Sequence, residues 1–310
     1  MINLQCMFSN LNRSIKDSQF PIDTNGIIKC YYGISSNGFF RISFLSKKNT
    51  GIKGTTKSID IVQGNSNDDI YWTCFDLKND NLLSVFCTFG EDLISSIFNE
   101  KNENIASAKL RFRFSTWLAL FKKSKNPFSL EKAKGLFGEL YFLKKYMIEV
   151  YGVENSIRAW SGPDMYSKDF AISDHWYEIK TISAHSNAVK ISSIQQLASD
   201  YVGHLIVVTT DEMADTFSGK DSSINELIQF IISEIADDNV KDEFLEKLSN
   251  IGYDMCDELG DKKYQVLKMD KYIVDDKFPI LRESDIKSKA ISNISYELVL
   301  KLLDDFLEVK

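Results

Sequence analysis

Residues 160–196 carry the most informative pattern of the chain, and they read WSGPDMYSKDFAISDHWYEIKTISAHSNAVKISSIQQ. Within this stretch, KDFAI at 168–172 and HWYEIKT at 175–181 are short runs rich in β-branched and aromatic residues. Only Ser173 and Asp174, two residues of the kinds found in turns, separate them. Two such runs around a two-residue turn predict a β-hairpin.

This hairpin would gather three charged side chains on one face. With the turn at residues 173–174, Asp169 lies opposite Glu178, and Lys180 shares their face because side chains alternate along a strand. The opposite face would be apolar and suits a core, with Phe170, Ile172, Tyr177 and Ile179. Opposed Cβ atoms in a hairpin are roughly 5 Å apart, so the two carboxylates repel each other unless a cation such as Mg²⁺ lies between them. The alternative is a surface hairpin with ordinary ion pairs.

A third carboxylate lies in the segment before the hairpin. Residues 130–150 read LEKAKGLFGELYFLKKYMIEV and predict a helix with Ser129 as its N-cap. The helical neighbours of Glu139 include Leu136, Phe142 and Leu143, so its carboxylate lies in an apolar stripe, where an unpaired charge is costly. Two glycines, Gly135 and Gly138, would let another element approach the helix closely. We therefore expect Glu139 in the same site, the alternative being a glutamate at the edge of the stripe that reaches water.

Composition indicates an ordinary globular protein. The chain has 310 residues, of which 44% are hydrophobic and 12% aromatic, enough for one large domain or two smaller ones. The N-terminal residues lack a basic segment followed by an apolar one, so we expect no signal peptide, and no apolar run approaches the roughly 18 residues of a membrane span. The cysteines are scattered and never paired as CxxC, which favours reduced thiols in the cytoplasm over disulfides or a zinc site; they are Cys6, Cys30, Cys74, Cys87 and Cys256.

Charge is distributed unevenly along the chain. The formal net charge of −7 is made up of +2 over residues 1–120, +2 over residues 121–210 and −11 over residues 211–310. Between Asn104 and Leu130 there is no acidic residue, and this run contains Lys109, Arg111, Arg113, Lys122, Lys123 and Lys125. Such a run suits a phosphate backbone. The alternative is a solvated helix face that pairs with the acidic last third.

The order of predicted elements indicates two parts. Residues 1–100 read mostly as strands and hairpins, followed by one helical stretch, and predict a β-rich accessory domain. In residues 101–310 we expect a helix from about Ile105, the helix bearing Glu139, the hairpin, a helix over 191–202 and a buried strand over 203–210. Helix, strand, strand, helix, strand is the order of an α/β (α+β) core with a central mixed sheet flanked by helices. Two amphipathic helices and late strands would follow.

The spacing D-x8-E-x-K on a hairpin, after a helix with an embedded glutamate, resembles the PD-(D/E)XK nuclease superfamily. Further blocks are similar to a bacterial family of PD-(D/E)XK members of unknown function: GLFGEL, W-x-G-P, DF, YEIKT, S-x-x-QL and a late FPIL…ISYEL. One departure is that Asp169 follows a lysine, whereas a literal Pro163-Asp164 lies upstream. We prefer Asp169, because Asp164 falls outside the hairpin pairing.

The resemblance implies a restriction-endonuclease-like core and a set of roles. Asp169 and Glu178 would be metal ligands, with the carbonyl of Ile179 and with Glu139 directly or through water, and Lys180 would be the catalytic lysine. The expected cofactor is Mg²⁺, which Mn²⁺ could replace, and the expected reaction is hydrolysis of phosphodiester bonds in DNA. Gln196 resembles an accessory glutamine of some superfamily nucleases and is expected to lie near nucleic acid.

Two functional hypotheses follow from the resemblance and the residues. The first is a metal-dependent DNA endonuclease of bacterial restriction or anti-phage defence, working in the cytoplasm. A homodimer or other defence proteins would be its partners. The second is a catalytically silent nucleic-acid-binding or assembly module of a defence complex. The intact Asp, Glu and Lys favour the first. A third hypothesis is a non-enzymatic scaffold whose acidic last third recruits a protein partner.

Overall fold

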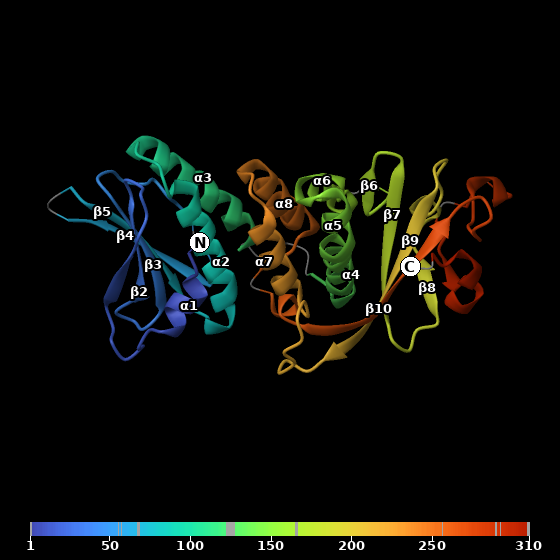
Figure 1. Ribbon diagram of the computed structural model, residues 1–310, viewed down its shortest axis with the longest axis horizontal. Coiled ribbons are helices and arrows are strands. Elements are labelled where there is room, and N and C mark those ends of the chain that lie inside the picture. The colour runs from blue at the N-terminus through green and yellow to red at the C-terminus, as the bar shows by residue number, and fades with distance from the viewer. Residues whose placement is uncertain are drawn as a thin grey trace. The chain divides into compact units, whose positions relative to one another are not determined.

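A computed structural model gives the architecture of the chain (Figure 1). It describes residues 2–54, 56, 58–66, 69–121, 128–164, 167–255, 257–288, 290–291 and 293–308. The chain forms two compact units: Met1–Lys125 with Tyr253–Cys256, and Asn126–Gly252 with Asp257–Lys310. The helix Glu103–Leu120 thus belongs to the first unit, whereas the sequence-based division grouped residues 101–310. The roles assigned to the two predicted domains stay predictions.

The first unit is built on a five-stranded antiparallel sheet, as its alternating strand pattern predicts. The order is β1 (Ser18–Ile22), β2 (Lys29–Ile34), β3 (Phe40–Ser46), β5 (Tyr71–Leu77) and β4 (Ile59–Asn65). The helices of this unit are α1 (Leu4–Ser9), α2 (Leu83–Ile97) and α3 (Glu103–Leu120). Aromatic rings join α2 and α3 to the sheet: the ring of Phe75 lies 5.3 Å from the rings of Phe89 and Phe114. The predicted β-rich fold of this part is confirmed.

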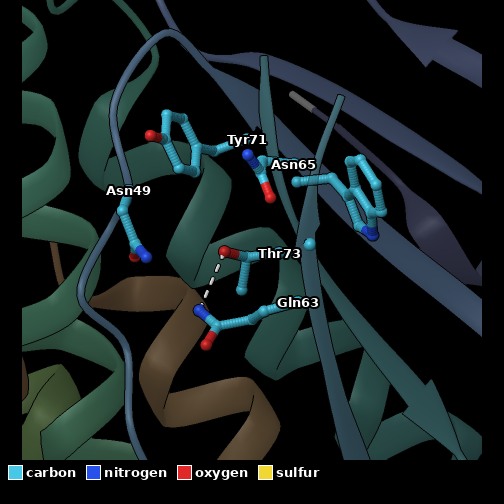
Figure 2. A pocket seen from close by; sticks show the side chains of 7 residues that line it. Asn49, Gln63, Asn65, Tyr71 and Thr73 are labelled. Carbon is cyan, nitrogen blue, oxygen red and sulfur yellow. Dashed lines mark hydrogen bonds between the residues drawn. The ribbon is translucent and has the colours of Figure 1, made fainter. Parts of the chain in front are cut away.

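A polar pocket lies on the sheet of the first unit (Figure 2). Its lining consists of Asn49, Gln63, Gly64, Asn65, Tyr71, Trp72 and Thr73. The Nε2 of Gln63 donates to Thr73 Oγ1 at 3.2 Å, and that hydroxyl also pairs with Thr50 Oγ1 at 2.9 Å. None of these described lining residues is charged, so the pocket offers no carboxylate ligands for a metal ion.

The second unit contains a four-stranded mixed sheet. Its order is β10 (Lys263–Val274), β9 (Gly203–Met213), β7 (His175–Ser183) and β6 (Phe170–Ile172). The pair β7–β9 is parallel, and the pairs β9–β10 and β6–β7 are antiparallel. The predicted α/β class with a central mixed sheet is confirmed. Helices of this unit are α4 (Leu130–Phe142), α5 (Ile148–Tyr151), α6 (Val153–Ala159), α7 (Ile224–Glu234) and α8 (Asp238–Ile251), with a π-helical turn, η2 (Leu143–Met147), between α4 and α5.

Both faces of this mixed sheet are covered. Helix α4 packs on β7 and on α7, and the small sheet of β8 (Ala188–Ile191) and β11 (Tyr296–Val299) lies on the other side (Figure 1). A core of Trp176, Val189, Leu205, Leu298 and neighbours fills the space between the two sheets. Strands buried on both faces read as continuous apolar runs, which explains the pattern of β9.

Three further expectations can be compared with the structure. Residues 191–202 do not form the predicted helix: they contain only the short 3₁₀ turn η4 (Ile194–Gln196). Within the described residues, no helix combines the length and the apolar character needed to cross a bilayer. The cysteines at positions 6, 30, 74 and 87 are free thiols, as expected.

Candidate active site

The predicted hairpin is present, in the predicted register. Phe170 pairs with Tyr177 and Ile172 with His175, and Ser173 adopts the left-handed conformation at the turn, with φ 55°. Phe170 and Tyr177 are buried on the predicted apolar face. The pairing of β6 with β7 ends at Phe170 and Tyr177. Asp169 and Glu178, the next residue of each strand, therefore lie just beyond the last pair of the hairpin.

Asp169 is fixed at the edge of β7 by its backbone and its side chain. Its carbonyl oxygen accepts hydrogen bonds from the N–H groups of Ser161 (2.8 Å) and Gly162 (3.1 Å). Its Oδ2 accepts from the N–H of Ile179 at 2.7 Å. Because the N–H and C=O of one strand residue point to the same side, the carbonyl of Ile179 faces the same edge.

Helix α4 brings Glu139 to this edge because a glycine lets the helix lie directly on β7. A Cβ at Gly138 would be 1.9 Å from Thr181 Oγ1 and 3.5 Å from Ile179 Cγ2, so a larger residue would push the helix away. The predicted close approach is confirmed at Gly138. At Gly135 it is wrong, since a Cβ there would meet nothing within 4 Å.

The carboxylates of Glu139 and Asp169 face one small space. A Cβ at Gly162 would lie 3.3 Å from Glu139 Oε2 and 3.2 Å from Asp169 Oδ1, so a glycine at this position leaves that space open. The indole N–H of Trp160 donates to Glu139 Oε2 at 2.8 Å and fixes the orientation of that carboxylate. Glu139 therefore belongs to the site and does not simply reach water from the helix surface.

Glu178 and Lys180 lie on one face of β7, as alternation predicts. The ammonium of Lys180 donates to Glu178 Oε1 at 2.8 Å and to Gln196 Oε1 at 3.2 Å. Glu178 is only 1% exposed, so the pair is not the surface ion pair of the alternative interpretation. Gln196 lies beside the lysine, where its Oε1 also accepts from the N–H of Ser192 at 2.8 Å.

Burial disfavours the ionised forms of all three carboxylates, and the charge of Asp169 adds to this effect at Glu139 and Glu178. Burial, and then the charge of Asp169, raises the pKa of Glu178 to about 8, although Lys180 opposes the shift. Burial also raises the pKa of Asp169, against the N–H of Ile179. The pKa of Glu139 lies well above its usual value because of burial and the charge of Asp169. Clustered, desolvated carboxyls with raised pKa values are typical of sites that bind a cation or move protons.

The donor set suits a hard divalent cation. Three carboxylates and the carbonyl of Ile179 supply oxygen ligands of the kind that Mg²⁺ and Mn²⁺ take. As the side chains stand, Asp169 Oδ2 and Glu178 Oε1 are engaged by an N–H and an ammonium. Over the described part of the chain, no three His, Cys, Asp or Glu side chains are arranged to hold a metal ion. The chemistry of the donors therefore fits the cation. For the cation to bind, Lys180 would have to move away from Glu178, or Glu178 would have to contact the lysine and the cation at the same time.

Asp164, the acid of the literal Pro163-Asp164 pair, forms an ion pair outside the carboxylate cluster. Asp164 ends the turn η3 (Gly162–Asp164), is exposed, and forms an ion pair with Lys247 at 3.3 Å. The same lysine donates to the carbonyl of Trp160. This geometry favours Asp169 as the acid of the site.

The basic run is not a uniform surface patch. Arg113 is 3% exposed and pairs with the buried Asp92, so we withdraw it from the predicted nucleic-acid contacts. Lys109 is at the surface and pairs with Glu100 at 3.1 Å, and Arg111 donates to the carbonyl of Thr50. The three other predicted contacts lie outside the described residues: Lys122, Lys123 and Lys125.

Two residues that the motif did not indicate complete the surroundings. One is Trp160, the donor to Glu139. The other is Lys168, whose ammonium donates to three backbone carbonyls in the segment 195–198. The sequence does mark Lys168, because it stands where the usual motif has proline. Its partners could not be predicted, because the carbonyls it binds are distant in sequence.

Comparison with known proteins identifies one family. The family model described as "Putative PD-(D/E)XK family member" matches residues 4–301 of the 310. No curated protein and no solved structure gives a significant match to the chain.

Proposed function

The chain belongs to the family described as "Putative PD-(D/E)XK family member", and from this premise we propose that it is a divalent-metal-dependent nuclease that hydrolyses phosphodiester bonds in DNA. The observation that carries the proposal is the meeting of Glu139, Asp169, Glu178 and Lys180 at one edge of β7. These residues come from a helix, a bend and a strand, and burial raises the pKa of Glu178 to about 8.

Each residue has a role in this proposal. Glu139, Asp169 and Glu178, with the carbonyl of Ile179, would hold Mg²⁺, and Mn²⁺ is expected to substitute. A bound divalent cation supplies charge stabilisation at the scissile phosphate and favours deprotonation of water. The ammonium of Lys180 is positioned to orient a water or to neutralise a phosphate oxygen, and Trp160 keeps the carboxylate of Glu139 in its orientation.

The biological setting is also part of the proposal. The family resemblance supports a place in bacterial restriction or anti-phage defence, in the cytoplasm. The excess of acidic residues in the last third supports reliance on a homodimer or on another defence protein for DNA affinity, since a net charge of −7 does not by itself attract a polyanion.

A cleavage assay tests the proposal. Purified protein is incubated with double-stranded DNA, single-stranded DNA and RNA, with Mg²⁺, Mn²⁺ or EDTA. We expect DNA cleavage with either metal and none with EDTA. Asp169→Asn, Glu178→Gln and Lys180→Met should each lower the rate by at least about 100-fold, because each removes a group that acts at the transition state.

Asp164→Asn is the matched control, since it removes a neighbouring carboxylate that lies on Lys247. It should leave the rate within about threefold, as expected for a group outside the chemistry. If no nucleic acid is cleaved with either metal while DNA is bound equally by wild type and the three variants, the protein is a catalytically silent binding module. If only RNA is cleaved, the DNA assignment is wrong.

A further inference from the structure

Lys168 lies next to Asp169 in sequence, but the two side chains have different hydrogen-bond partners. Asp169 reaches the N–H of Ile179, whereas the Nζ of Lys168 donates to the carbonyls of Gln195 (2.7 Å), Gln196 (2.7 Å) and Ala198 (3.0 Å). An ammonium has three N–H donors, so these three acceptors satisfy it completely. The lysine thereby connects residue 168 to the backbone of residues 195–198, which overlap with η4.

The side chain of Lys168 also contacts an aromatic ring. Its Nζ lies 4.0 Å from the ring centre of Trp176, within the range of a cation–π contact. Trp176 is itself fixed, because it is 4% exposed and its indole N–H donates to the carbonyl of Tyr201 at 3.0 Å. The ammonium is therefore a rigid link between the hairpin and residues 195–198.

The segment that Lys168 holds contains the residue that contacts Lys180. Gln196 Oε1 accepts from Lys180 Nζ at 3.2 Å and from the N–H of Ser192 at 2.8 Å. The side chains of Ile194 and Leu197 are buried, but η4 has no regular helix on either side, so the bonds from Lys168 fix the backbone around Gln196. Without these bonds the backbone of Gln196 would be free to shift. The carboxamide would then no longer direct the ammonium of Lys180.

We propose that Lys168 is a positioning residue that acts through Gln196 to hold the ammonium of Lys180 at the candidate active site. The inference rests on the proposed function for its catalytic consequence and on the hydrogen bonds for its structural one. It gives a role to the lysine that stands where the motif has proline.

The first readout is structural and does not depend on activity. Ser192 is an exposed residue whose N–H bonds to Gln196 Oε1, so its amide hydrogen exchange reports the position of the glutamine. Lys168→Met should raise the exchange rate of the Ser192 amide at least about tenfold, since the N–H loses its acceptor. Lys168→Arg, which keeps the charge and several donors, should restore part of the protection.

The second readout is kinetic. Lys168→Met should lower kcat by about 10- to 100-fold, the usual effect of a residue that orients a catalytic group, with KM nearly unchanged. The double variant Lys168→Met, Gln196→Met should be no slower than the slower single variant, because both changes break the same connection. Multiplicative effects would show that Lys168 does not act through Gln196.

Lys144→Met is the matched control for folding. Its ammonium is also largely buried, lies 3.4 Å from the ring centre of Phe230 and pairs with Asp221. This variant should lose thermal stability and keep both Ser192 protection and kcat. The inference is overturned if Lys168→Met leaves the Ser192 amide protected, or if Lys144→Met exposes it equally. If wild type cleaves nothing but Lys168→Met alone exposes the amide, the nuclease proposal fails and the positioning role stands.

Discussion

At the scale of the residue, the surroundings of Glu178 oppose ionisation of its carboxyl group. It is almost fully buried, it faces the charge of Asp169, and the pKa of its carboxyl rises to about 8 despite the bond from Lys180. A divalent cation would reverse this balance, because it favours the ionised forms of all the carboxylates at once. The raised pKa values thus follow first from burial of the carboxyls and, for Glu139 and Glu178, also from the charge of Asp169.

Much of the site could be predicted residue by residue. Asp169, Glu178 and Lys180 follow from hairpin register and alternation, which are local properties of the sequence. The bonds from Trp160 to Glu139 and from Lys168 to residues 195–198 could not be predicted, because they join positions with no regular spacing between them. Arg113 was misassigned, since a charge count does not reveal that a buried Asp92 would pair with it.

His204 allows a pH prediction away from the carboxylates. Burial, and then the charge of Lys271, lowers the pKa of its ring to about 4, against the pull of Glu308. The unfolded chain binds a proton near pH 6.5 and the folded chain only near pH 4, so its contribution to stability is lost as pH falls between these values. In chemical denaturation from pH 7 to pH 4, His204→Gln should reduce the loss of unfolding free energy by up to about 3 kcal/mol. Equal losses in both proteins would contradict this assignment.

At the scale of the element, the packing of α4 on β7 decides whether the site assembles. The glycines of GLFGEL predicted a close approach, and the structure assigns that role to Gly138 alone. The predicted helix over 191–202 failed for a tertiary reason. Three carbonyls that a longer helix would use for its own hydrogen bonds are bound by Lys168.

The two glycines of α4 form a matched pair. Gly138→Ala would put a Cβ 1.9 Å from Thr181 Oγ1, so we expect a loss of about 1–3 kcal/mol of unfolding free energy from overpacking. Displacement of Glu139 should also lower nuclease activity. Gly135→Ala should be neutral or raise stability by up to about 1 kcal/mol through helix propensity. Denaturant titration and the cleavage assay check both, and equal behaviour of the two variants would show that Gly138 is not the contact.

At the scale of the whole molecule, charge is segregated along the sequence. Residues 1–210 are mildly basic and residues 211–310 carry −11. The first unit contains the described part of the basic run, and the second contains the carboxylate site. Fold class could be predicted because long amphipathic helices and buried strands leave clear periodicity. The division into units could not, because α3 reads equally well as the start of the second part.

Salt dependence tests the basic run. Replacing Arg111, Lys122, Lys123 and Lys125 by glutamine should weaken DNA binding. It should also reduce the slope of log K against log salt by about 0.9 for each phosphate contact that is lost. Arg113→Gln is the contrasting variant, and it should lower stability without changing the slope, since it breaks a buried pair. Fluorescence anisotropy at several salt concentrations measures both, and an unchanged slope in the fourfold variant would remove the run from the DNA interface.

The central claim of the proposal is that Glu139, Asp169 and Glu178 bind a divalent cation when the pair of Glu178 and Lys180 opens or adjusts. Crystals soaked in Mn²⁺ test it most directly, because anomalous scattering locates the ion without reference to activity. We predict an anomalous peak within about 2.3 Å of carboxylate oxygens of Asp169 and Glu178, and its loss in Asp169→Asn but not in Asp164→Asn. Peaks only at other carboxylates, in a protein that cleaves DNA with Mn²⁺, would contradict the account.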